Sequence, residues 1–552
     1  VKGIDFQVDA GKILGIVGES GSGKSMTSLS LMRLLPDAGE VKAGTALFSL
    51  PGEPPVDLFQ LPEKEMRSYR GRHIAMVFQE PMTALNPVFR CGVQVTEALR
   101  QHFPISQKEA REQTLELFKK VKLPDPERMF SSYPHELSGG QKQRVMIAMA
   151  ISCKPRLLIA DEPTTALDVT VQKAILQLIK DLQQEYQMSV IFITHDLGVV
   201  AGLADEVMVM RKGEALEYGT VKDIFERPQH PYTQGLLACR PSHQVRMSRL
   251  FTVEDFEQHR GQDKPLSVSI KEAEISPEAH QLRQQMLQAQ APLLKAKHLK
   301  VWFPKRKGLF SRVYDHVKAV DDVSFELYPG ETLGLVGESG CGKTTLGRSL
   351  LRLIEPTDGS ILLNGQDLRQ LGPEALRRLR PDMQLIFQDP YSSLNPRMRV
   401  GEAIAEPLLV HQPALSRKER KDKVVQLLER VGLVSADYDK YPVQFSGGQR
   451  QRVCIARALI LHPKLVICDE SVSALDVSVQ AQVLNLLKAL QAEYGLAYLF
   501  ISHDLSVVRF MSDRMMVMKE GKIVESGDAE QMYQHPEHPY TRQLIEAVPG
   551  RG

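Results

Sequence analysis

A long internal repeat constrains the fold of this chain more than any other feature. The segment GIVGESGSGKS near the start returns as GLVGESGCGKT in the second half, and its two lysines, Lys24 and Lys343, lie 319 residues apart. From Ser138 and Ser446 onward the separation is constant at 308 residues. This self-similarity indicates one structural module present twice, with about ten extra residues in the first copy. We assign the surplus to the proline-rich segment 51–62, which predicts a surface loop.

The repeat also sets the predicted domain boundaries. The first domain covers residues 1–240 and the second covers residues 293–552, while residues 241–292 form a linker that contains a polar helix from Pro277 to Gln290. The sequence VKGIDF at Val1 matches VDDVSF at Val320, yet the second copy begins about 27 residues before its match. We therefore expect the first copy to lack the first strand of the module, and we interpret the sequence as incomplete at its N-terminus.

Composition narrows the class of protein. The 552 residues are 43% hydrophobic and carry a formal net charge of +2, which gives no global reason to expect nucleic acid as the main partner. The sequence contains no apolar stretch of the roughly 18 to 20 residues that a membrane span needs, and no export segment at its start. We therefore expect a cytosolic chain. The six cysteines are scattered without CxxC pairs, which argues against disulfides, zinc or an iron–sulfur cluster.

Each copy alternates apolar strands with helices. The segments LGIVG and LGLVG precede the glycine-rich loops, and LLIAD, LVICD, VIFIT and YLFIS predict further strands. Continuous apolar runs are typical of a mostly parallel sheet that is covered on both faces. Between Gln79 and Ser138, and again between Gln388 and Ser446, the pattern becomes helical. This predicts a helical subdomain inserted into each α/β core.

The two glycine-rich loops predict phosphate binding. Residues 18–25 and 337–344 both fit GxxxxGK[ST] between a strand and a helix. In such loops backbone N–H groups surround the phosphates, Lys24 and Lys343 reach the terminal phosphates, and the hydroxyls of Ser25 and Thr344 bind Mg²⁺. Two matches in register make coincidence a poor explanation. The other predicted loop residues are Gly18, Ser20, Gly21, Gly23, Gly337, Ser339, Gly340 and Gly342.

Two acidic pairs end predicted strands. Asp161 and Glu162 follow LLIA, and Asp469 and Glu470 follow LVIC, at the strand edge where α/β proteins bind ligands. One carboxylate can support Mg²⁺, and the other can orient and polarise a water molecule, which suffices for phosphoryl transfer together with the lysine and the metal. An isolated Asp–Glu pair would more often be a solvated strand end. The two glycine loops favour the catalytic interpretation.

Two Ser-Gly-Gly turns open helical patterns, at LSGGQ (137–141) and FSGGQ (445–449). Such a turn offers an anion the exposed N–H groups and the positive dipole end of a helix, although alone it would more often be a simple cap. With the loops and acidic pairs, these turns make the chain resemble the ATP-binding cassette (ABC) ATPase family over nearly all of both halves. The resemblance implies two tandem P-loop domains, each a RecA-like core with an inserted helical subdomain and an antiparallel β element.

The resemblance further implies that the two halves pair head to tail within the chain, so that the turn of each half completes the ATP site of the other. The turn residues implied for the site at Lys343 are Ser138, Gly139 and Gly140. Those implied for the site at Lys24 are Ser446, Gly447 and Gly448.

Roles for other residues follow from the same resemblance. It implies that Glu162 and Glu470 are general bases and that His195 and His503 contact the γ-phosphate, although a lone histidine after a strand is more often structural. Gln79 and Gln388 would sense Mg²⁺ and the attacking water, and Asp168 and Asp476 would bridge the halves. The implied Mg²⁺ ligands are Ser25, Gln79, Asp161, Thr344, Gln388 and Asp469. Because both copies carry these residues, we predict two competent sites.

The two copies depart from each other at two positions. Ser471 follows Glu470 where the first copy has Pro163, which changes the stiffness of the loop rather than its chemistry. Tyr314 has no aromatic equivalent in the first copy. By the resemblance it stacks on adenine, and the alternative is a surface aromatic residue.

The machine that the ATPase drives is also suggested by resemblance. QEPMTALNP and QDPYSSLNP, together with HPYT at His230 and His538, resemble the ATPases of importers for glutathione, dipeptides or oligopeptides, although HPYT alone could be a proline-directed turn. Such systems imply two transmembrane permease subunits, an extracytoplasmic solute-binding protein and a peripheral position at the cytoplasmic face of the inner membrane. The solute stays open between glutathione and other short peptides. A rival class of tandem cassettes acts on ribosomes or nucleic acid, but the short linker of mixed charge disfavours it.

Overall fold

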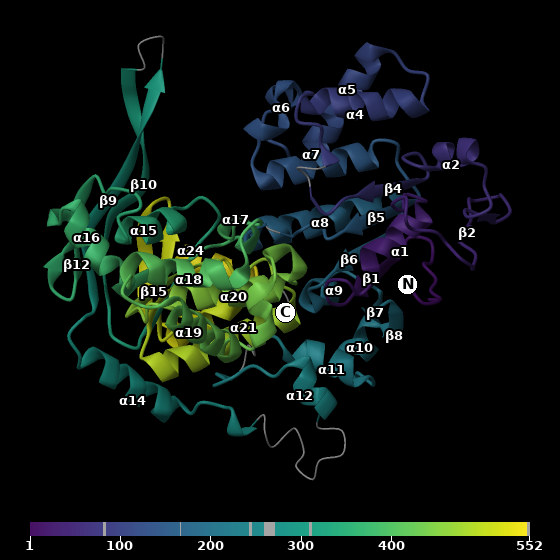
Figure 1. Cartoon of the computed structure of the whole chain (residues 1–552). Helices are drawn as coiled ribbons and strands as arrows, with labels where there is room; N and C mark the ends of the chain where they lie inside the picture. Colours follow the sequence, from purple (N-terminus) through teal and green to yellow (C-terminus); the bar gives the residue numbers. More distant parts are fainter. Residues whose placement is uncertain (81–83, 166, 242–244, 259–270, 308–311, 549–552) are drawn as a thin grey trace. The chain divides into compact units, whose positions relative to one another are not determined.

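The computed structural model describes residues 1–80, 84–165, 167–241, 245–258, 271–307 and 312–548 (Figure 1). The chain divides into two compact units, Val1–Leu237 and Ala238–Arg551. Each unit contains one six-stranded sheet with the same topology. The internal repeat is therefore a repeat of the fold, and each unit is described by itself below.

The sheet of the first unit is parallel except at one edge. Its strand order is β4-β5-β6-β1-β7-β8, and only β8 runs antiparallel to its neighbour. The strands are β1 (Ile13–Val17), β4 (Ile74–Val77), β5 (Leu157–Asp161), β6 (Ser189–Thr194), β7 (Glu206–Arg211) and β8 (Glu214–Thr220). These include the predicted strands LGIVG, LLIAD and VIFIT. The parallel sheet that the apolar runs predicted is therefore confirmed.

Alternate residues of the central strands pack on opposite faces of this sheet. In β6, Val190 and Phe192 belong to one buried cluster, while Ile191 and Ile193 belong to the other. Because both faces are buried, the strand shows a continuous apolar run instead of an alternating one. The covering helices include α1 (Lys24–Leu31), α8 (Val169–Tyr186) and α9 (Leu197–Ala201).

A helical subdomain interrupts the first unit between β4 and β5. It contains α4 (Cys91–His102), α5 (Gln107–Lys120), α6 (Pro126–Ser131) and α7 (Gly139–Ile151), which lie together in Figure 1. The helices α4 and α6 approach closely at Gly92, where an added Cβ would lie 2.2 Å from the Phe130 ring. The predicted helical insertion between Gln79 and Ser138 is thus confirmed.

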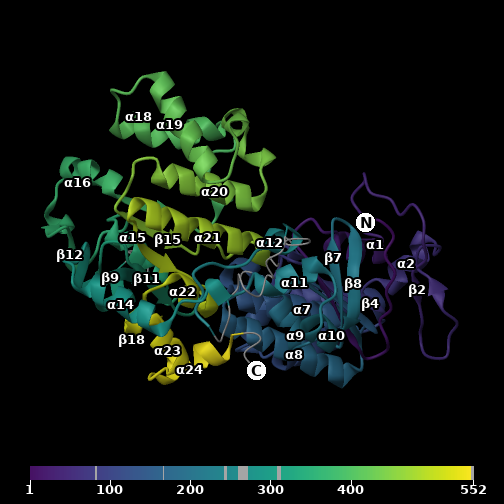
Figure 2. The ribbon, with the colours of Figure 1, turned by 90° about the horizontal axis from the view of Figure 1, so that it is seen from below.

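The second unit repeats this plan with the order β14-β15-β16-β11-β17-β18. The strands are β11 (Thr332–Val336), β14 (Met383–Ile386), β15 (Leu465–Asp469), β16 (Ala497–Ile501), β17 (Arg514–Lys519) and β18 (Lys522–Asp528). Its principal helices are α15 (Lys343–Leu350), α18 (Val400–His411), α19 (Arg417–Arg430), α20 (Gly447–Leu459), α21 (Val477–Tyr494) and α22 (Leu505–Met511). Figure 2 shows α18, α19 and α20 grouped on one side of this unit.

The antiparallel β element is larger in the second unit. There β9 (Leu294–Lys307), β10 (Arg312–Leu327), β12 (Asp358–Leu363) and β13 (Gln366–Asp367) form a sheet in the order β10-β9-β12-β13. Because β12 pairs with β9 only between 294 and 300, the rest of the β9–β10 hairpin projects as a two-stranded ribbon (Figure 1). In the described part of the first unit the counterpart is the short pair β2 (Leu47–Phe48) and β3 (Val56–Asp57). The proline-rich segment 51–62 is therefore loop except at β3.

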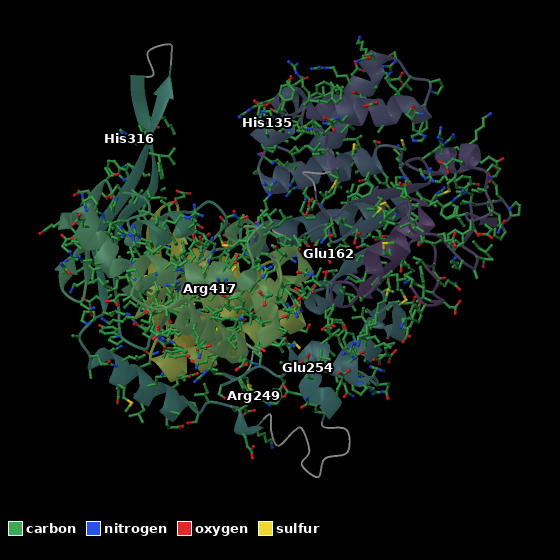
Figure 3. The ribbon with its side chains drawn as sticks, in the orientation of Figure 1. His135, Glu162, Arg249, Glu254, His316 and Arg417 are labelled. Carbon is green, nitrogen blue, oxygen red and sulfur yellow. The ribbon has the colours of Figure 1, made fainter. Side chains whose placement is uncertain are left out.

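Residues 245–258, which we call the docking segment, pack on the second unit. Figure 3 labels two of its members, Arg249 and Glu254. Leu250 is buried, and its backbone N–H donates to Asn485 Oδ1 at 2.8 Å while its carbonyl accepts from Asn485 Nδ2, also at 2.8 Å. Arg246 donates to the backbone carbonyl of Ser512 at 2.6 Å. The side-chain amide of Asn485, in α21, thus satisfies both backbone groups of Leu250, as a neighbouring strand would in a sheet.

The helix that follows is fixed to the same unit. This helix, α14 (Pro277–Gln288), lies within the interval where the sequence predicted a polar helix. Its Arg283 donates to both carboxylate oxygens of Asp513, at 2.5 and 3.0 Å, and Asp513 also accepts the backbone N–H of Thr332 at 2.9 Å. The described parts of the predicted linker 241–292 therefore belong structurally with the second unit.

Replacing Asn485 tests the docking segment. In Asn485→Leu, two backbone groups of buried Leu250 lose their partner, so we expect the second unit to lose about 1–3 kcal/mol of unfolding free energy. Urea denaturation followed by the fluorescence of the single tryptophan, Trp302, measures this loss. Ala492→Leu places the same side chain at an exposed position of α21 and is expected to change stability by less than about 0.5 kcal/mol. Equal effects of the two substitutions would contradict the role of Asn485.

Candidate active sites

Each glycine-rich loop joins a central strand to the helix that follows it in the chain. In the first unit the loop lies between β1 and α1, and in the second between β11 and α15. Gly18 and Gly337 both have φ of 154°, and an added Cβ would lie 2.1 Å from the Met210 carbonyl or 2.2 Å from the Met518 carbonyl. Only glycine fits at this point, because the loop backbone passes directly over the end of a neighbouring strand.

The loop lysines are buried and held by the loop itself. Lys24 Nζ donates to the carbonyls of Gly18 at 2.7 Å and Glu19 at 2.9 Å. Lys343 repeats both contacts with Gly337 and Glu338 at the same distances. The two ammonium groups are therefore oriented within the loop, as a phosphate site requires. The predicted loop residues Ser20, Gly21, Ser339 and Gly340 are exposed to solvent.

The hydroxyl after each loop lysine contacts the aspartate that ends β5 in the first unit or β15 in the second. Each of these strands lies two positions from the strand that precedes the loop. Ser25 Oγ lies 3.1 Å from Asp161 Oδ1, and Thr344 Oγ1 lies 2.9 Å from Asp469 Oδ1. Burial raises the pKa of both aspartates above the usual value, and the hydroxyl hydrogen bonds oppose that shift. Hard oxygen donors beside a buried carboxylate fit Mg²⁺ that also binds phosphate oxygens. The described residues contain no group of three His, Cys, Asp or Glu side chains placed for a metal.

The glutamate after each aspartate adopts a left-handed backbone conformation, with φ of 46° at Glu162 and 47° at Glu470. Glutamate rarely adopts this conformation, and such strain is concentrated at functional sites. Each backbone N–H still donates to a neighbouring strand, at Ile193 or Ile501, both at 2.9 Å. The turn therefore directs the carboxylate away from the sheet ladder while the ladder stays intact.

The carboxylate of Glu162, labelled in Figure 3, is the centre of a polar cluster. Its Oε2 lies 3.1 Å from His195 Nδ1, accepts from Thr165 Oγ1 at 2.9 Å, and accepts from Gln79 Nε2 at 3.3 Å. Burial raises the pKa of Glu162, but the hydrogen bond and charge of His195, with the bond from Thr165, outweigh it and lower the pKa to about 2. The carboxylate is therefore ionised and acceptor-only at neutral pH.

The second unit builds the same cluster with different spacing. Gln388 Nε2 donates to Glu470 Oε2 at 2.8 Å, His503 Nδ1 lies at 3.5 Å, and Lys343 Nζ lies 4.0 Å from Oε1. Burial raises the pKa of Glu470, but His503 and Lys343 lower it overall. Burial lowers the pKa of His503, but Glu470 raises it overall. The structure thus brings together the predicted glutamate, histidine and glutamine of each site.

One contact of the first cluster is missing from the prediction. Thr165 donates to the Glu162 carboxylate, whereas its counterpart Ser473 donates to the backbone carbonyl of Glu470 at 2.9 Å. A hydroxyl three residues after each glutamate was visible in the sequence, but the repeat alone could not distinguish a side-chain acceptor from a backbone acceptor. The two sites therefore differ in the hydrogen bonds that support the predicted general base.

The Ser-Gly-Gly turns begin helices, as predicted. Ser138 and Ser446 are N-caps of α7 and α20, and each forms a reciprocal capping box with the glutamine three residues later. An added Cβ at Gly140 would lie 2.7 Å from Val171, and at Gly448 the distance to Val479 is 2.2 Å. The second glycine is thus required by packing against α8 or α21. The first glycines, Gly139 and Gly447, open the helices.

The remaining predicted site residues occupy varied positions. Asp168 caps α8 by accepting the Val171 N–H at 2.9 Å, and Asp476 is the N-cap residue of α21. Tyr314 lies in β10 between the paired residues Val313 and Asp315, where the register shifts, but its side chain lies outside the described residues. Its adenine contact stays a prediction.

Among the helices that the structure describes, none has the length and apolar character of a membrane span.

The HPYT segments contact the glycine-rich loops, which the sequence did not predict. Tyr232 and Tyr540 are buried, and their hydroxyls accept the backbone N–H of Glu19 at 3.2 Å and of Glu338 at 3.1 Å. Recurrence of HPYT at the same offset was a signal that the segment matters. It carried no information on which part of the unit the tyrosine touches.

Family models and known proteins match most of this chain. The family model "ABC transporter" matches residues 1–165 and 320–473, and the model "Oligopeptide/dipeptide transporter, C-terminal region" matches residues 216–260 and 524–551. The glutathione import ATP-binding protein GsiA of Pectobacterium atrosepticum is 52% identical over 551 residues, which is 100% of this chain and 86% of that protein. GsiA of Escherichia coli K12 is 51% identical with the same coverage. A solved bacterial ABC transporter cassette is 28% identical over 43% of this chain and 98% of its own, with a TM-score of 0.39.

Replacing Thr165 tests the asymmetry between the sites. In a Glu470→Gln background, where Glu162 is the remaining general base, Thr165→Val is expected to slow ATP hydrolysis about three- to tenfold, because a hydrogen bond to a charged group is lost. Since that bond holds the pKa of Glu162 low, the acid limb of the rate profile moves to higher pH. Steady-state rates at pH 7, and from there down to the lowest pH at which the variant stays folded, measure both effects.

The matched control is Ser473→Ala in a Glu162→Gln background. Ser473 donates to a backbone carbonyl and not to the Glu470 carboxylate, so the acid limb is expected to stay in place. Equal shifts of the acid limb in both backgrounds would contradict the difference between the sites.

Proposed function

The chain belongs to the ABC transporter family, and from this premise we propose that it is the ATPase subunit of an importer for glutathione or short peptides. The observation that carries the proposal is the presence, in both units, of a complete set of hydrolytic groups. Each set contains a loop lysine, a hydroxyl–aspartate pair and a Glu–His–Gln cluster. Two intact sets favour an enzyme that hydrolyses ATP at two sites.

In this proposal each group acts by position and charge. The loop lysine neutralises the terminal phosphates, and the glutamate accepts a hydrogen bond from the attacking water and later its proton. His195 and His503 keep the glutamate ionised and contact the γ-phosphate. Gln79 and Gln388 orient the water. Mg²⁺, held through Ser25 and Asp161 or through Thr344 and Asp469, would neutralise charge on the transferred phosphoryl group.

We further propose that the cassettes pair head to tail, so that Ser446 and Gly448 complete the site at Lys24 and Ser138 and Gly140 complete the site at Lys343. The capped helix N-termini support this role, because their first N–H groups and positive dipole ends suit a phosphate. Asp168 and Asp476, at the N-terminal ends of α8 and α21, would bridge the halves. Tyr314 would stack on the adenine of the second site.

Nucleotide trapping tests this pairing. A chain carrying Glu162→Gln and Glu470→Gln is expected to retain ATP at both sites, because the phosphate loops are intact while the general bases are lost. Photolabelling with an azido-ATP, followed by tryptic digestion and identification of the labelled peptide, assigns the label to one half. Adding Ser446→Arg is expected to abolish the label on the first half, and Ser138→Arg the label on the second. Loss of label from the half that carries each substitution would contradict the head-to-tail arrangement.

A groove in the second unit supports docking of a permease subunit. The groove has a volume of about 650 Å³ and lies between β14, α17 (Pro390–Ser393), α18 and α20. Phe387 and Val410 line it and are 36% and 46% exposed, and Phe387 immediately precedes Gln388 of the hydrolytic cluster. A short amphipathic segment of a permease would fill such a groove and press on the residue before the glutamine. We accordingly propose a peripheral position at the cytoplasmic face of the inner membrane, with two permease subunits and an extracytoplasmic solute-binding protein.

The transported solute is proposed from the relatives. GsiA is named as a glutathione import protein, and this chain matches it along its whole length. The oligopeptide/dipeptide model at the end of each cassette favours a second candidate, a dipeptide or oligopeptide.

Stimulated hydrolysis distinguishes the candidates. The chain is copurified with the permease subunits that bind it and reconstituted with the cognate solute-binding protein. We expect glutathione to raise ATP hydrolysis several-fold and a dipeptide mixture to have a smaller effect. The reverse order would identify a peptide importer, and stimulation by ribosomes or DNA alone would overturn the importer assignment.

A further inference from the structure

The HPYT segments hold a tyrosine against each phosphate loop by the same construction. Each segment begins a short helix, α11 (Pro231–Ala238) or α24 (Pro539–Glu546). The His230 ring accepts the backbone N–H of Tyr232 at 3.1 Å, and the His538 ring accepts that of Tyr540 at 3.1 Å. The histidine and the start of the helix thus set the direction in which the tyrosine leaves the backbone.

An acidic residue fixes the histidine in turn. Glu217, in β8, accepts the backbone N–H groups of Gln229 at 2.8 Å and His230 at 3.1 Å. Glu525, in β18, does the same for Glu537 and His538, at 3.0 and 3.1 Å. The segment is therefore tied to the antiparallel edge strand of its sheet. This support makes the tyrosine a rigid element and not a mobile surface side chain.

The tyrosine hydroxyl contacts one particular peptide unit of the loop. The N–H of Glu19, which donates to Tyr232, belongs to the same peptide as the carbonyl of Gly18, which accepts from Lys24 at 2.7 Å. In the second unit the Gly337–Glu338 peptide is held in the same way by Tyr540 and Lys343. The N–H of this peptide is thus hydrogen-bonded to the tyrosine hydroxyl, and its carbonyl is hydrogen-bonded to the lysine.

This peptide needs an external support because glycine precedes it. Gly18 and Gly337 have no Cβ, so the peptide that follows each glycine rotates more freely than it would after another residue. Rotation would turn the carbonyl away from the lysine. A hydrogen bond from the N–H to a fixed hydroxyl opposes that rotation.

A cationic side chain also packs against each tyrosine ring. Arg211 lies 4.6 Å above the Tyr232 ring and Lys519 lies 4.8 Å above the Tyr540 ring, each at the end of the strand that also abuts the loop glycine. Burial raises the pKa of Tyr540 further above its usual value. The phenol therefore stays neutral at physiological pH.

We propose that Tyr232 and Tyr540 are positioning residues that orient Lys24 and Lys343 for the ATP phosphates, acting through the peptide they grip. The inference rests on the proposed ATPase function. It assigns the C-terminal region of each cassette a role in nucleotide binding. The tyrosines touch the loop backbone and not the nucleotide.

Tyr540→Phe tests the inference, because it removes the hydroxyl and keeps the ring. ATP binding to the second site is measured by titration of the full chain in a Lys24→Ala background. We expect the dissociation constant to rise about three- to tenfold, as for loss of one hydrogen bond whose partner stays buried. The turnover number at saturating ATP is expected to change less than twofold, because the general base is untouched. Exchange of the loop amides with deuterium is expected to be faster.

Tyr498→Phe is the matched control in the same unit. Tyr498 is buried, and its hydroxyl donates to the Leu487 carbonyl at 3.1 Å, away from the phosphate loop. We expect this variant to lower the thermal midpoint at least as much as Tyr540→Phe while leaving ATP affinity within twofold. The parallel test of the first unit is Tyr232→Phe in a Lys343→Ala background.

The outcomes separate this inference from the proposed function. If the parent chain binds ATP and Tyr540→Phe binds it equally well with unchanged loop exchange, the positioning role is wrong. If affinity falls equally in Tyr498→Phe, the effect is general destabilisation and the positioning role is again wrong. If the parent chain binds no ATP, the ATPase function itself is wrong.

Discussion

The active sites depend on keeping a buried glutamate ionised. Burial alone would protonate Glu162 and Glu470 more readily, and a protonated carboxyl could not accept a proton from water. The histidine opposite each carboxylate reverses that tendency, helped by Thr165 in one unit and Lys343 in the other. The left-handed turn at each glutamate places the carboxylate within reach of these partners. Each glutamine donates to the carboxylate oxygen that also faces the histidine.

The two units hold the buried glutamate with different contacts. In the first, Glu162 accepts three hydrogen bonds at one oxygen, whereas in the second the glutamine bond is shorter and the histidine is farther away. The residue three positions later also differs, because Thr165 donates to the carboxylate whereas Ser473 donates to a backbone carbonyl. The two copies of the module thus keep the glutamate but differ in the contacts that support it. Equal turnover at the two sites does not follow from equal motifs.

Much of this was predictable because the chemistry-bearing residues sit at points that backbone geometry dictates. The mostly parallel sheet followed from buried apolar runs, and the loop and capping residues followed from glycine and serine positions. What the sequence could not supply were contacts between distant segments with no periodic signature. Asn485 pairing with Leu250, Thr165 reaching Glu162 and Tyr232 reaching Glu19 each depend on side-chain direction in the folded unit. The sequence indicated a polar helix in the interval 241–292, but it did not indicate that this interval packs on the second unit.

The family-specific region that includes the first HPYT segment has two consequences for the chain. It spans residues 216–260, so it contains both Tyr232, which grips the first phosphate loop, and the docking segment, which is held by Asn485 in the second unit. Only eight residues lie between Leu237, the last residue of the first unit, and Arg246, and this connection spans about 30 Å when fully extended. A docked segment therefore shortens the effective connection between the cassettes far below the length of the interval 241–292. Since the effective concentration of two linked partners falls as their connection lengthens, docking would favour the encounter that the proposed head-to-tail pairing requires.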